Sequence, residues 1–157
     1  STGMVTSAAI SPDGKYVVYV ESLQGEQSLN LRDVGGAQSL ELIEARPVAY
    51  WGVTFDPDST AIYFGIKSDE DPTGAMYQIS TLGGNPRRLV SRLDSHPTFS
   101  PDGARMAWLV ARFPEQQQSA IMVANSDGSD SRILSTFTFP EVVSPIFHAA
   151  PAWSPDG

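Results

Sequence analysis

Short apolar and β-branched runs recur along the chain in a fixed order, and turn residues bound each run. Runs of roughly four to eight such residues between Gly, Pro, Asn and Asp are typical of β-strands. They occupy residues 16–20, 29–34 and 39–43, then 61–66, 76–79 and 88–90, then 106–110, 121–124 and 132–134. No window of about a dozen residues keeps the i, i+3, i+4 apolar spacing of an amphipathic helix. The pattern therefore predicts an all-β protein.

One turn motif sets the period of this pattern. It is an apolar residue followed by Ser-Pro-Asp-Gly or a close variant, and it lies at 10–14, 55–59, 99–103 and 153–157. The motif prolines are 45, 44 and 54 residues apart. With the run before each motif, every period holds four strands, the signature of a β-propeller blade. We predict four-stranded antiparallel blades at about 4–44, 48–91 and 94–136, with 149–157 as the first strand of a fourth.

The motif has the chemistry of a tight turn between the first, innermost strand of a blade and the second. Pro presets φ at the second turn position, Ser accepts a hydrogen bond at the first, and Gly adopts a positive φ at the end. Ser59 replaces this Gly in the second copy, so that turn must tolerate strain or close through Thr60. The innermost strands are expected to end near Ile10, Phe55, Phe99 and Trp153.

Composition narrows the class of protein. The chain has 157 residues, 41% of them hydrophobic, which suffices for one domain with a buried core. Its net charge of -8 and ten scattered Lys and Arg residues do not supply a nucleic-acid surface. The absence of Cys excludes disulfides and thiolate chemistry. No apolar run is long enough to span a bilayer, so we expect no membrane contact by this segment.

The spelling of the copies resembles a known repeat. The stretches SPDGKYVVYV, FSPDGARMAWLV and PAWSPDG, with RRLV and SRIL strands after the Gly turns, resemble the TolB-like propeller repeat over essentially the whole chain. The opening STGMVTSAAISPDGKYVVYV also resembles the propeller region of some bacterial serine/threonine protein kinases. This resemblance implies that the chain is a fragment of a propeller with six or more blades, and that it works in the periplasm or elsewhere outside the cytoplasm.

The resemblance favours a non-catalytic propeller that serves as a protein-interaction or sensing module of a larger bacterial protein, either a receptor-like kinase or a TolB-like periplasmic protein. Two alternatives stay open: the substrate-gating propeller of a prolyl-oligopeptidase-type serine peptidase, and a small-ligand-binding propeller. The chain has no Gly-x-Ser-x-Gly elbow, and neither His96 nor His148 lies beside a plausible Ser and carboxylate. We expect no catalytic residue and no cofactor in this chain, and a protein as its partner.

Candidate contact residues fall in two places. Trp51, His96 and Trp153 lie at ends of innermost strands, where a propeller has its channel mouth. The connection 137–148 is about ten residues longer than its counterparts and carries three Phe. Connections are normally polar, so this one either folds back as a plug or binds a protein through aromatic anchors. Its candidate contact residues are Phe139, Phe147 and His148.

Two acidic segments superficially suggest cation sites. Residues 125–130 place Gly at loop position four, where a calcium loop requires it at six, and no Glu occupies position twelve. This segment is predicted to be a hairpin turn, and the acidic stretch 68–74 a solvated loop. The Asp of the turn motif recurs in every copy, as a structural role predicts. We therefore expect no metal site.

A short run of blades leaves an apolar sheet face at each end. Missing sequence, collapse of the end blades or a second chain must cover such faces. Two three-bladed copies could complete a ring of about six blades, so a homo-oligomer is one expectation.

Overall fold

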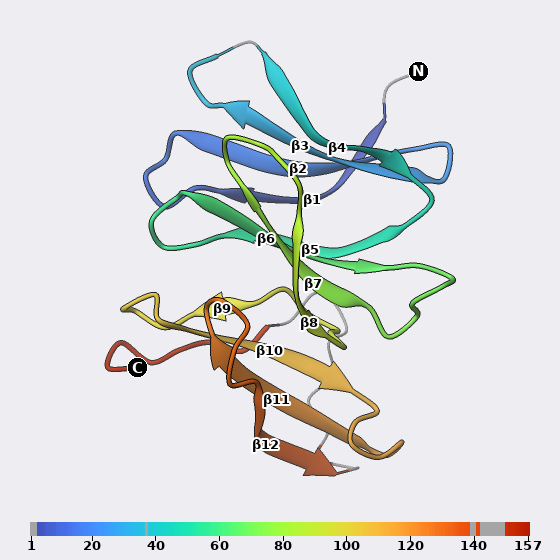
Figure 1. Ribbon diagram of the computed structural model, residues 1–157, viewed down its shortest axis with the longest axis vertical. Coiled ribbons are helices and arrows are strands. Elements are labelled where there is room, and N and C mark those ends of the chain that lie inside the picture. The colour runs from blue at the N-terminus through green and yellow to red at the C-terminus, as the bar shows by residue number, and fades with distance from the viewer. Residues whose placement is uncertain (1–2, 37, 139–140, 142–149) are drawn as a thin grey trace.

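The computed structural model describes residues 3–36, 38–138, 141 and 150–157, and these form an all-β structure. Within them, twelve strands make three four-stranded antiparallel sheets, which we call blades 1, 2 and 3 (Figure 1). Blade 1 comprises β1 (Met4–Ile10), β2 (Tyr16–Leu23), β3 (Glu26–Asp33) and β4 (Ser39–Arg46). Blade 2 comprises β5 (Ala49–Phe55), β6 (Ala61–Lys67), β7 (Ala75–Ser80) and β8 (Arg87–Ser91). Blade 3 comprises β9 (Thr98–Phe99), β10 (Arg105–Ala111), β11 (Gln118–Asn125) and β12 (Arg132–Thr138).

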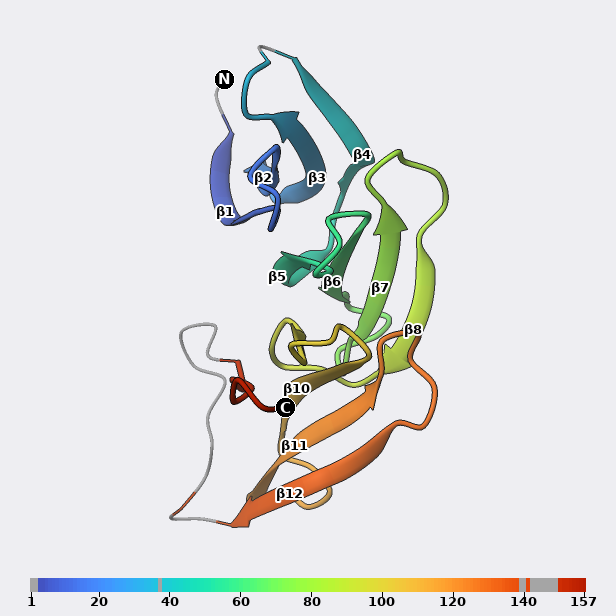
Figure 2. The ribbon, with the colours of Figure 1, turned by 90° about the vertical axis from the view of Figure 1, so that its left-hand side faces the viewer.

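The predicted fold class is confirmed. Each predicted run lies within or overlaps one strand, and the innermost strands end at Ile10, Phe55 and Phe99 as expected. Figure 2 shows the blades stacked in an arc, with β1 and β5 on its inner side and β4, β8 and β12 on its outer side. Residues 150–157 form the motif turn, in which Gly157 N–H donates to Ser154 O at 3.0 Å. They do not form the predicted strand, because no described segment pairs with them along a ladder.

The blades pack face to face through alternate side chains of their second strands. On β2, Val18 and Val20 are buried against blade 2. On β6, Phe64 joins that same cluster while Tyr63 joins the cluster shared with blade 3. Trp108 of β10 completes the second cluster. Successive side chains of a strand point to opposite faces, so one strand in the middle blade supplies both interfaces.

The motif turns keep their shape through side-chain hydrogen bonds. In the first copy, Ser11 Oγ donates to Asp13 Oδ1 at 2.7 Å and accepts from Tyr16 N–H at 2.9 Å. The third copy repeats both contacts from Ser100. In the second copy Asp56 replaces Ser, and its Oδ1 accepts from the N–H groups of Thr60 and Ala61 at 2.8 and 3.1 Å. The single carboxylate of Asp56 thus accepts the two backbone hydrogen bonds that a Ser and an Asp side chain accept in the other copies.

Ser59 tolerates the strain that its position imposes. Its φ is 61°, in the left-handed region that the Gly residues of the other copies occupy. Its Oγ accepts a hydrogen bond from Asp13 N–H of the neighbouring blade at 3.2 Å. The next pair of turns is also in contact, since a Cβ on Gly103 would lie 3.2 Å from Pro57 Cγ. Successive motif turns are therefore in contact from blade to blade. The backbone strain at Ser59 is offset by its hydrogen bond to Asp13 in the neighbouring blade.

We predict that Ser59→Ala lowers the free energy of unfolding by about 1–2 kcal/mol, because the strain stays and the hydrogen bond to Asp13 is lost. Ser59→Gly loses the same bond but relieves strain of about 1 kcal/mol, so its loss is smaller. Urea unfolding of both variants measures the difference. A Ser59→Ala variant as stable as the wild type would show that the Asp13 contact contributes nothing.

The turn carboxylates also predict a pH response. The hydroxyl of Ser11 and the N–H of Lys15 hold the pKa of Asp13 at about 2, below its ordinary value of 3.8. A carboxyl whose pKa is depressed by folding stabilises the fold above its unfolded value and loses that contribution as pH falls through the folded value. The chain is expected to lose stability between about pH 4 and pH 2. In thermal melts, the melting temperature of Asp13→Asn should fall less than that of the wild type between these pH values.

The far face of blade 1 is left uncovered by the described residues. It carries exposed apolar side chains, among them Ile10 at 68% and Val5 at 55% exposure. The counterparts of Ile10 pack between blades: Phe55 of β5 is buried and Phe99 of β9 is partly buried. The prediction that a second copy covers this face is not tested by the structure and stays a prediction. In the described part of the chain, no helix is long and apolar enough to cross a bilayer.

Candidate functional site

The candidate site lies where the innermost strands begin. This end of the blades carries the β2–β3, β6–β7 and β10–β11 loops and the connections between blades, and we call it the loop face. The ladder between β5 and β6 is interrupted there: Tyr50 pairs with Ile66 and Val53 with Phe64, so Trp51 and Gly52 form a bulge. β1 has an irregularity at the equivalent point, between Val5 and Ser7. A bulge bends a strand and re-aims its side chains.

Blade 3 breaks its inner strand in a different way. Pro97 has no N–H, and the ladder between β9 and β10 covers only two residue pairs. Side chains replace the missing strand partners beyond it: Ser95 Oγ accepts from Leu109 N–H at 2.9 Å, and Asp94 Oδ2 accepts from Ala111 N–H at 2.7 Å. Asp94 N–H in turn donates to Leu109 O at 2.8 Å. The segment before β9 is thus held against β10 as a strand would be, with a carboxylate at its edge.

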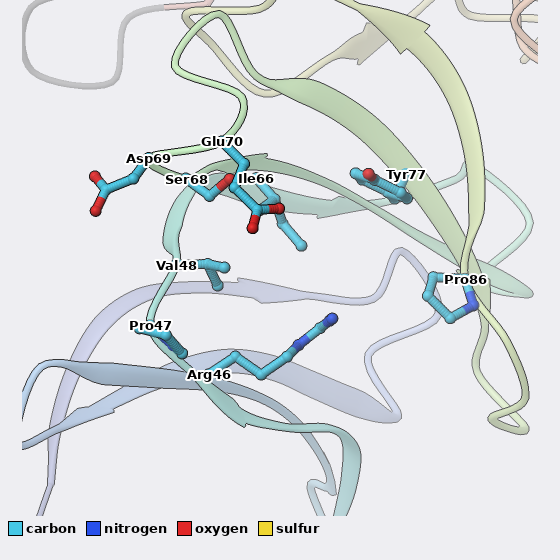
Figure 3. Close-up of a pocket in the computed structure, with 9 residues that line it drawn as sticks. All are labelled: Arg46, Pro47, Val48, Ile66, Ser68, Asp69, Glu70, Tyr77 and Pro86. Atoms are coloured by element: carbon cyan, nitrogen blue, oxygen red, sulfur yellow. The ribbon is translucent and has the colours of Figure 1, made fainter.

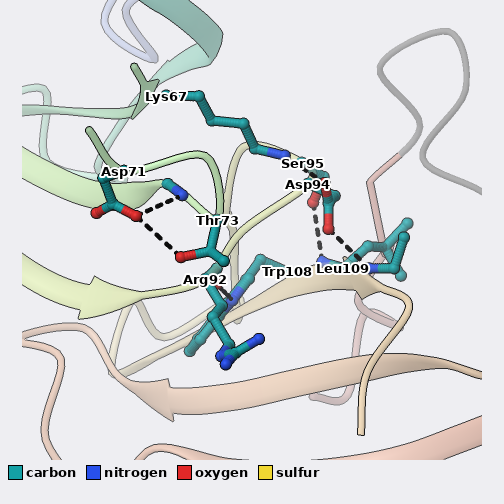
Figure 4. Close-up of polar contacts among 10 residues, drawn as sticks. Lys67, Asp71, Thr73, Arg92, Asp94, Ser95, Trp108 and Leu109 are labelled. Carbon is teal, nitrogen blue, oxygen red and sulfur yellow. Dashed lines mark hydrogen bonds and ion pairs between the residues drawn. The ribbon is translucent and has the colours of Figure 1, made fainter. Parts of the chain in front are cut away.

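That carboxylate ties blade 2 to blade 3. Figure 4 shows Lys67, from the end of β6, reaching Asp94, and the Lys67 Nζ to Asp94 Oδ1 distance is 2.5 Å. Both side chains are 17% exposed. Lys67 Nζ also lies 4.0 Å from the centre of the Trp51 ring, within the range of a cation–π contact. Trp51, Lys67 and Asp94 therefore form one polar cluster across the seam between the two blades.

The sequence candidates at the channel mouth are only partly brought together. His96 packs on the bulge beside Trp51: a Cβ on Gly52, whose φ is 81°, would lie 2.7 Å from His96 Cβ. Trp153 instead donates from Nε1 to Thr98 O at 3.1 Å and lies 5.1 Å beneath the guanidinium of Arg105, at the start of β10. The remaining candidates, Phe139, Phe147 and His148, lie outside the described residues.

Lys67 and Asp94 were not predicted from the sequence. Their contact joins residues 27 positions apart in two blades, and neither belongs to the turn motif or to an apolar run. Asp94 does stand seven residues before the motif proline, where the preceding repeat has Tyr50. The change from Tyr to Asp at this position, together with Pro97, is the signal in the sequence that blades 2 and 3 meet through different contacts from blades 1 and 2.

The two acidic segments have structural partners. Asp71, in the β6–β7 loop, accepts from Gly74 N–H at 3.1 Å and forms a salt bridge with Arg88. Residues 125–130 form the predicted hairpin between β11 and β12, closed by a hydrogen bond from Gly128 N–H to Asn125 O. No group of three or more His, Cys, Asp or Glu suited to a metal ion occurs among the residues placed by the structure.

Comparisons with known proteins identify the fold. Two curated relatives are similar over most of this chain, and both are TolB homologues. The one from Chlorobium chlorochromatii is 31% identical over 111 residues, or 66% of this chain and 23% of its own length. The one from Chlorobium luteolum is 26% identical over 74% of this chain and 26% of its own length. The chain is a TolB-like β-propeller. It spans about a quarter of the length of these relatives, and no family model matches it.

Solved structures agree on the fold of this TolB-like propeller and differ in function. TolB from Acinetobacter baumannii has a TM-score of 0.62 and 21% identity over 85% of this chain and 32% of its own. A nidogen/laminin complex has a TM-score of 0.65 and 16% identity over 86% of this chain and 49% of its own. An oligogalacturonate lyase in complex with manganese has a TM-score of 0.66 and 15% identity over 83% of this chain and 41% of its own. At these identities the likeness establishes the fold alone.

The seam cluster predicts the effect of removing its cation. Lys67→Met leaves the half-buried carboxylate of Asp94 without its ion-pair partner, so we expect a loss of about 1–3 kcal/mol in unfolding free energy. Lys15→Met is the matched control, because Lys15 is 71% exposed in its salt bridge with Asp13 and such pairs contribute little. Chemical denaturation of both variants measures the contrast. Equal stabilities would mean that the cluster does not hold the two blades together.

Proposed function

We propose that this propeller is a non-catalytic module that binds a protein partner through its loop face, within a larger bacterial protein that works outside the cytoplasm. The observation that carries the proposal is the 31% identity to a TolB homologue over two thirds of the chain. The extracytoplasmic location follows from the same resemblance. The association with a kinase domain stays a prediction.

The chemistry of the loop face supports a binding role over a catalytic one. The carboxylate of Asp94 is engaged by Lys67 and Ala111 N–H. Ser95 Oγ accepts from Leu109 N–H and donates to His96 O at 3.0 Å, so this hydroxyl serves the backbone. A nucleophile needs a general base within hydrogen-bond reach, and Ser95 Oγ is committed to structural bonds instead. The lyase with the same fold is too distant in sequence to favour an activity here.

Capture of a partner through the loop face tests the proposal. The chain is immobilised and exposed to an envelope extract of the source bacterium, and a retained protein is identified by mass spectrometry. We expect His96→Ala to reduce its retention, since His96 lies at the loop face beside the bulge. Lys15→Ala, at the opposite ends of the strands, should not change it. Both variants are first shown by circular dichroism to melt like the wild type.

Two results would contradict this function. The first is retention that is the same for His96→Ala and the wild type, which would move the contact away from the loop face. The second is turnover of oligogalacturonate or of peptide substrates by the purified chain, at a rate that contaminating enzymes do not explain. Either alternative named from the sequence, a small-ligand propeller or the gating propeller of a peptidase, would then be preferred.

A further inference from the structure

A groove lies between blades 1 and 2 on the loop face. Its volume is about 520 Å³, within the range of pockets that hold ligands. The connection from β4 to β5 supplies one wall, with Arg46 and Val48, and the end of β6 with the β6–β7 loop supplies the other, with Ile66 and Glu70 (Figure 3). Tyr77 of β7 and Pro86 line the other end.

Two opposite charges face this groove without neutralising each other. Figure 3 shows the Arg46 guanidinium and the Glu70 carboxylate pointing into the space between the walls, with Val48 and Ile66 between them. Asp69, the neighbour of Glu70, points away. In the portion of the chain that the structure places, neither Arg46 nor Glu70 takes part in a salt bridge. The groove thus presents a cation, an apolar floor and an anion in succession.

A buried hydroxyl lies beside Arg46, behind the wall of the groove. Tyr50 is 8% exposed, and its hydroxyl proton has no acceptor among the described residues. Burial raises the pKa of Tyr50 to about 12, whereas the charge of Arg46 and the hydrogen-bonding contact of its side chain act in the opposite direction. The phenol therefore keeps its proton at neutral pH. Buried polar groups are nearly always hydrogen bonded, so this hydroxyl is a donor that lacks an acceptor.

The aromatic wall behind the groove is rigid. The Tyr50 and Phe64 rings lie 5.6 Å apart, and Phe64 stacks on Tyr77 at 5.8 Å with an interplanar angle of 14°. Rings packed in this way fix the surface that a ligand meets, which lowers the entropic cost of binding.

The equivalent place in the next seam is closed by the protein itself. Tyr50 stands seven residues before the motif proline, as Asp94 does in the following repeat. Asp94 is paired with Lys67 across blades 2 and 3, whereas the Tyr50 hydroxyl, between blades 1 and 2, lies against the Arg46 cation and has no acceptor among the described residues. The same position of the fold is satisfied internally at one seam and left open at the other.

We propose that the groove binds an extended peptide segment of the partner, in which an acidic and a basic residue flank an apolar one. The acidic side chain accepts hydrogen bonds from Arg46, whose guanidinium lies against the Tyr50 phenol, and the basic side chain pairs with Glu70. The apolar residue lies over Val48, Ile66 and Tyr77. Charge complementarity of this kind selects a partner and fixes its direction. The assignment rests on the proposed function, because it locates one contact of the protein partner.

Blocked tripeptides test the assignment without knowledge of the partner. ELK and KLE are titrated into the full chain and followed by NMR, with QLQ as the uncharged control. We expect one charged peptide to bind at least about tenfold more tightly than QLQ, and the order that binds fixes the direction. Arg46→Gln and Glu70→Gln should each remove this preference. Glu44→Gln is the matched control and should leave it unchanged, because Glu44 is exposed on β4 and does not line the groove.

Tyr50→Phe separates a binding role from a structural one. Phe keeps the ring packing on Phe64, so the free chain should melt close to the wild type. The same substitution should weaken the charged peptide several-fold, because the phenol oxygen no longer holds the Arg46 guanidinium in place. Unchanged peptide affinity in Tyr50→Phe would show that Tyr50 takes no part in the site.

The outcomes distinguish the groove from the wider function. If neither charged peptide binds more tightly than QLQ while His96→Ala still reduces partner capture, the groove proposal is wrong and the proposed function stands. If free glutamate or lysine displaces the peptide at equal concentration, the ligand is a small charged molecule and the peptide assignment is wrong. If the peptides bind as expected but no envelope protein is retained, the groove stands and the wider function fails.

Discussion

The alternation of side chains along the second strand of each blade is the constraint on which the structure depends. Val18 of β2 and Phe64 of β6 meet in one core, and Tyr63 of β6 and Trp108 of β10 meet in the next. A shift of one residue in the pairing of β6 would reverse both faces at once. The register of the middle blade is therefore fixed from two sides, and the ends of its strands are held where the turns and the loop face need them.

Two different sets of polar contacts then hold the blades at the ends of these strands. At the motif end the contacts repeat: Ser59 bonds to Asp13 and Gly103 lies on Pro57. At the loop face they do not repeat, since only the seam between blades 2 and 3 carries the ion pair of Lys67 with Asp94 among the described residues. The motif end thus provides a common frame, and the loop face varies from one blade to the next.

This difference explains what the sequence could predict. The strands, their order and the ends of the innermost strands were predictable, because turn residues and apolar runs recur at a fixed period and each recurrence supports the others. The contacts of Lys67, Asp94 and Tyr50 were not, because they join residues that are far apart in sequence and differ between repeats. Even the placement of Trp153 beside Thr98 depends on a chain path that the repeat does not specify.

In a repeat protein, a residue that recurs in every copy is explained by the fold, and a residue that departs from the pattern needs another reason. Asp94 departs from it and is explained by Lys67, which neutralises it. Tyr50 occupies the same position, and its hydroxyl is buried against the guanidinium of Arg46, which forms no salt bridge with any described residue. Phe at that position would retain the ring packing on Phe64 and avoid the cost of burying the hydroxyl. A phenol oxygen that holds the Arg46 guanidinium at the groove is a reason for Tyr in place of Phe at this seam.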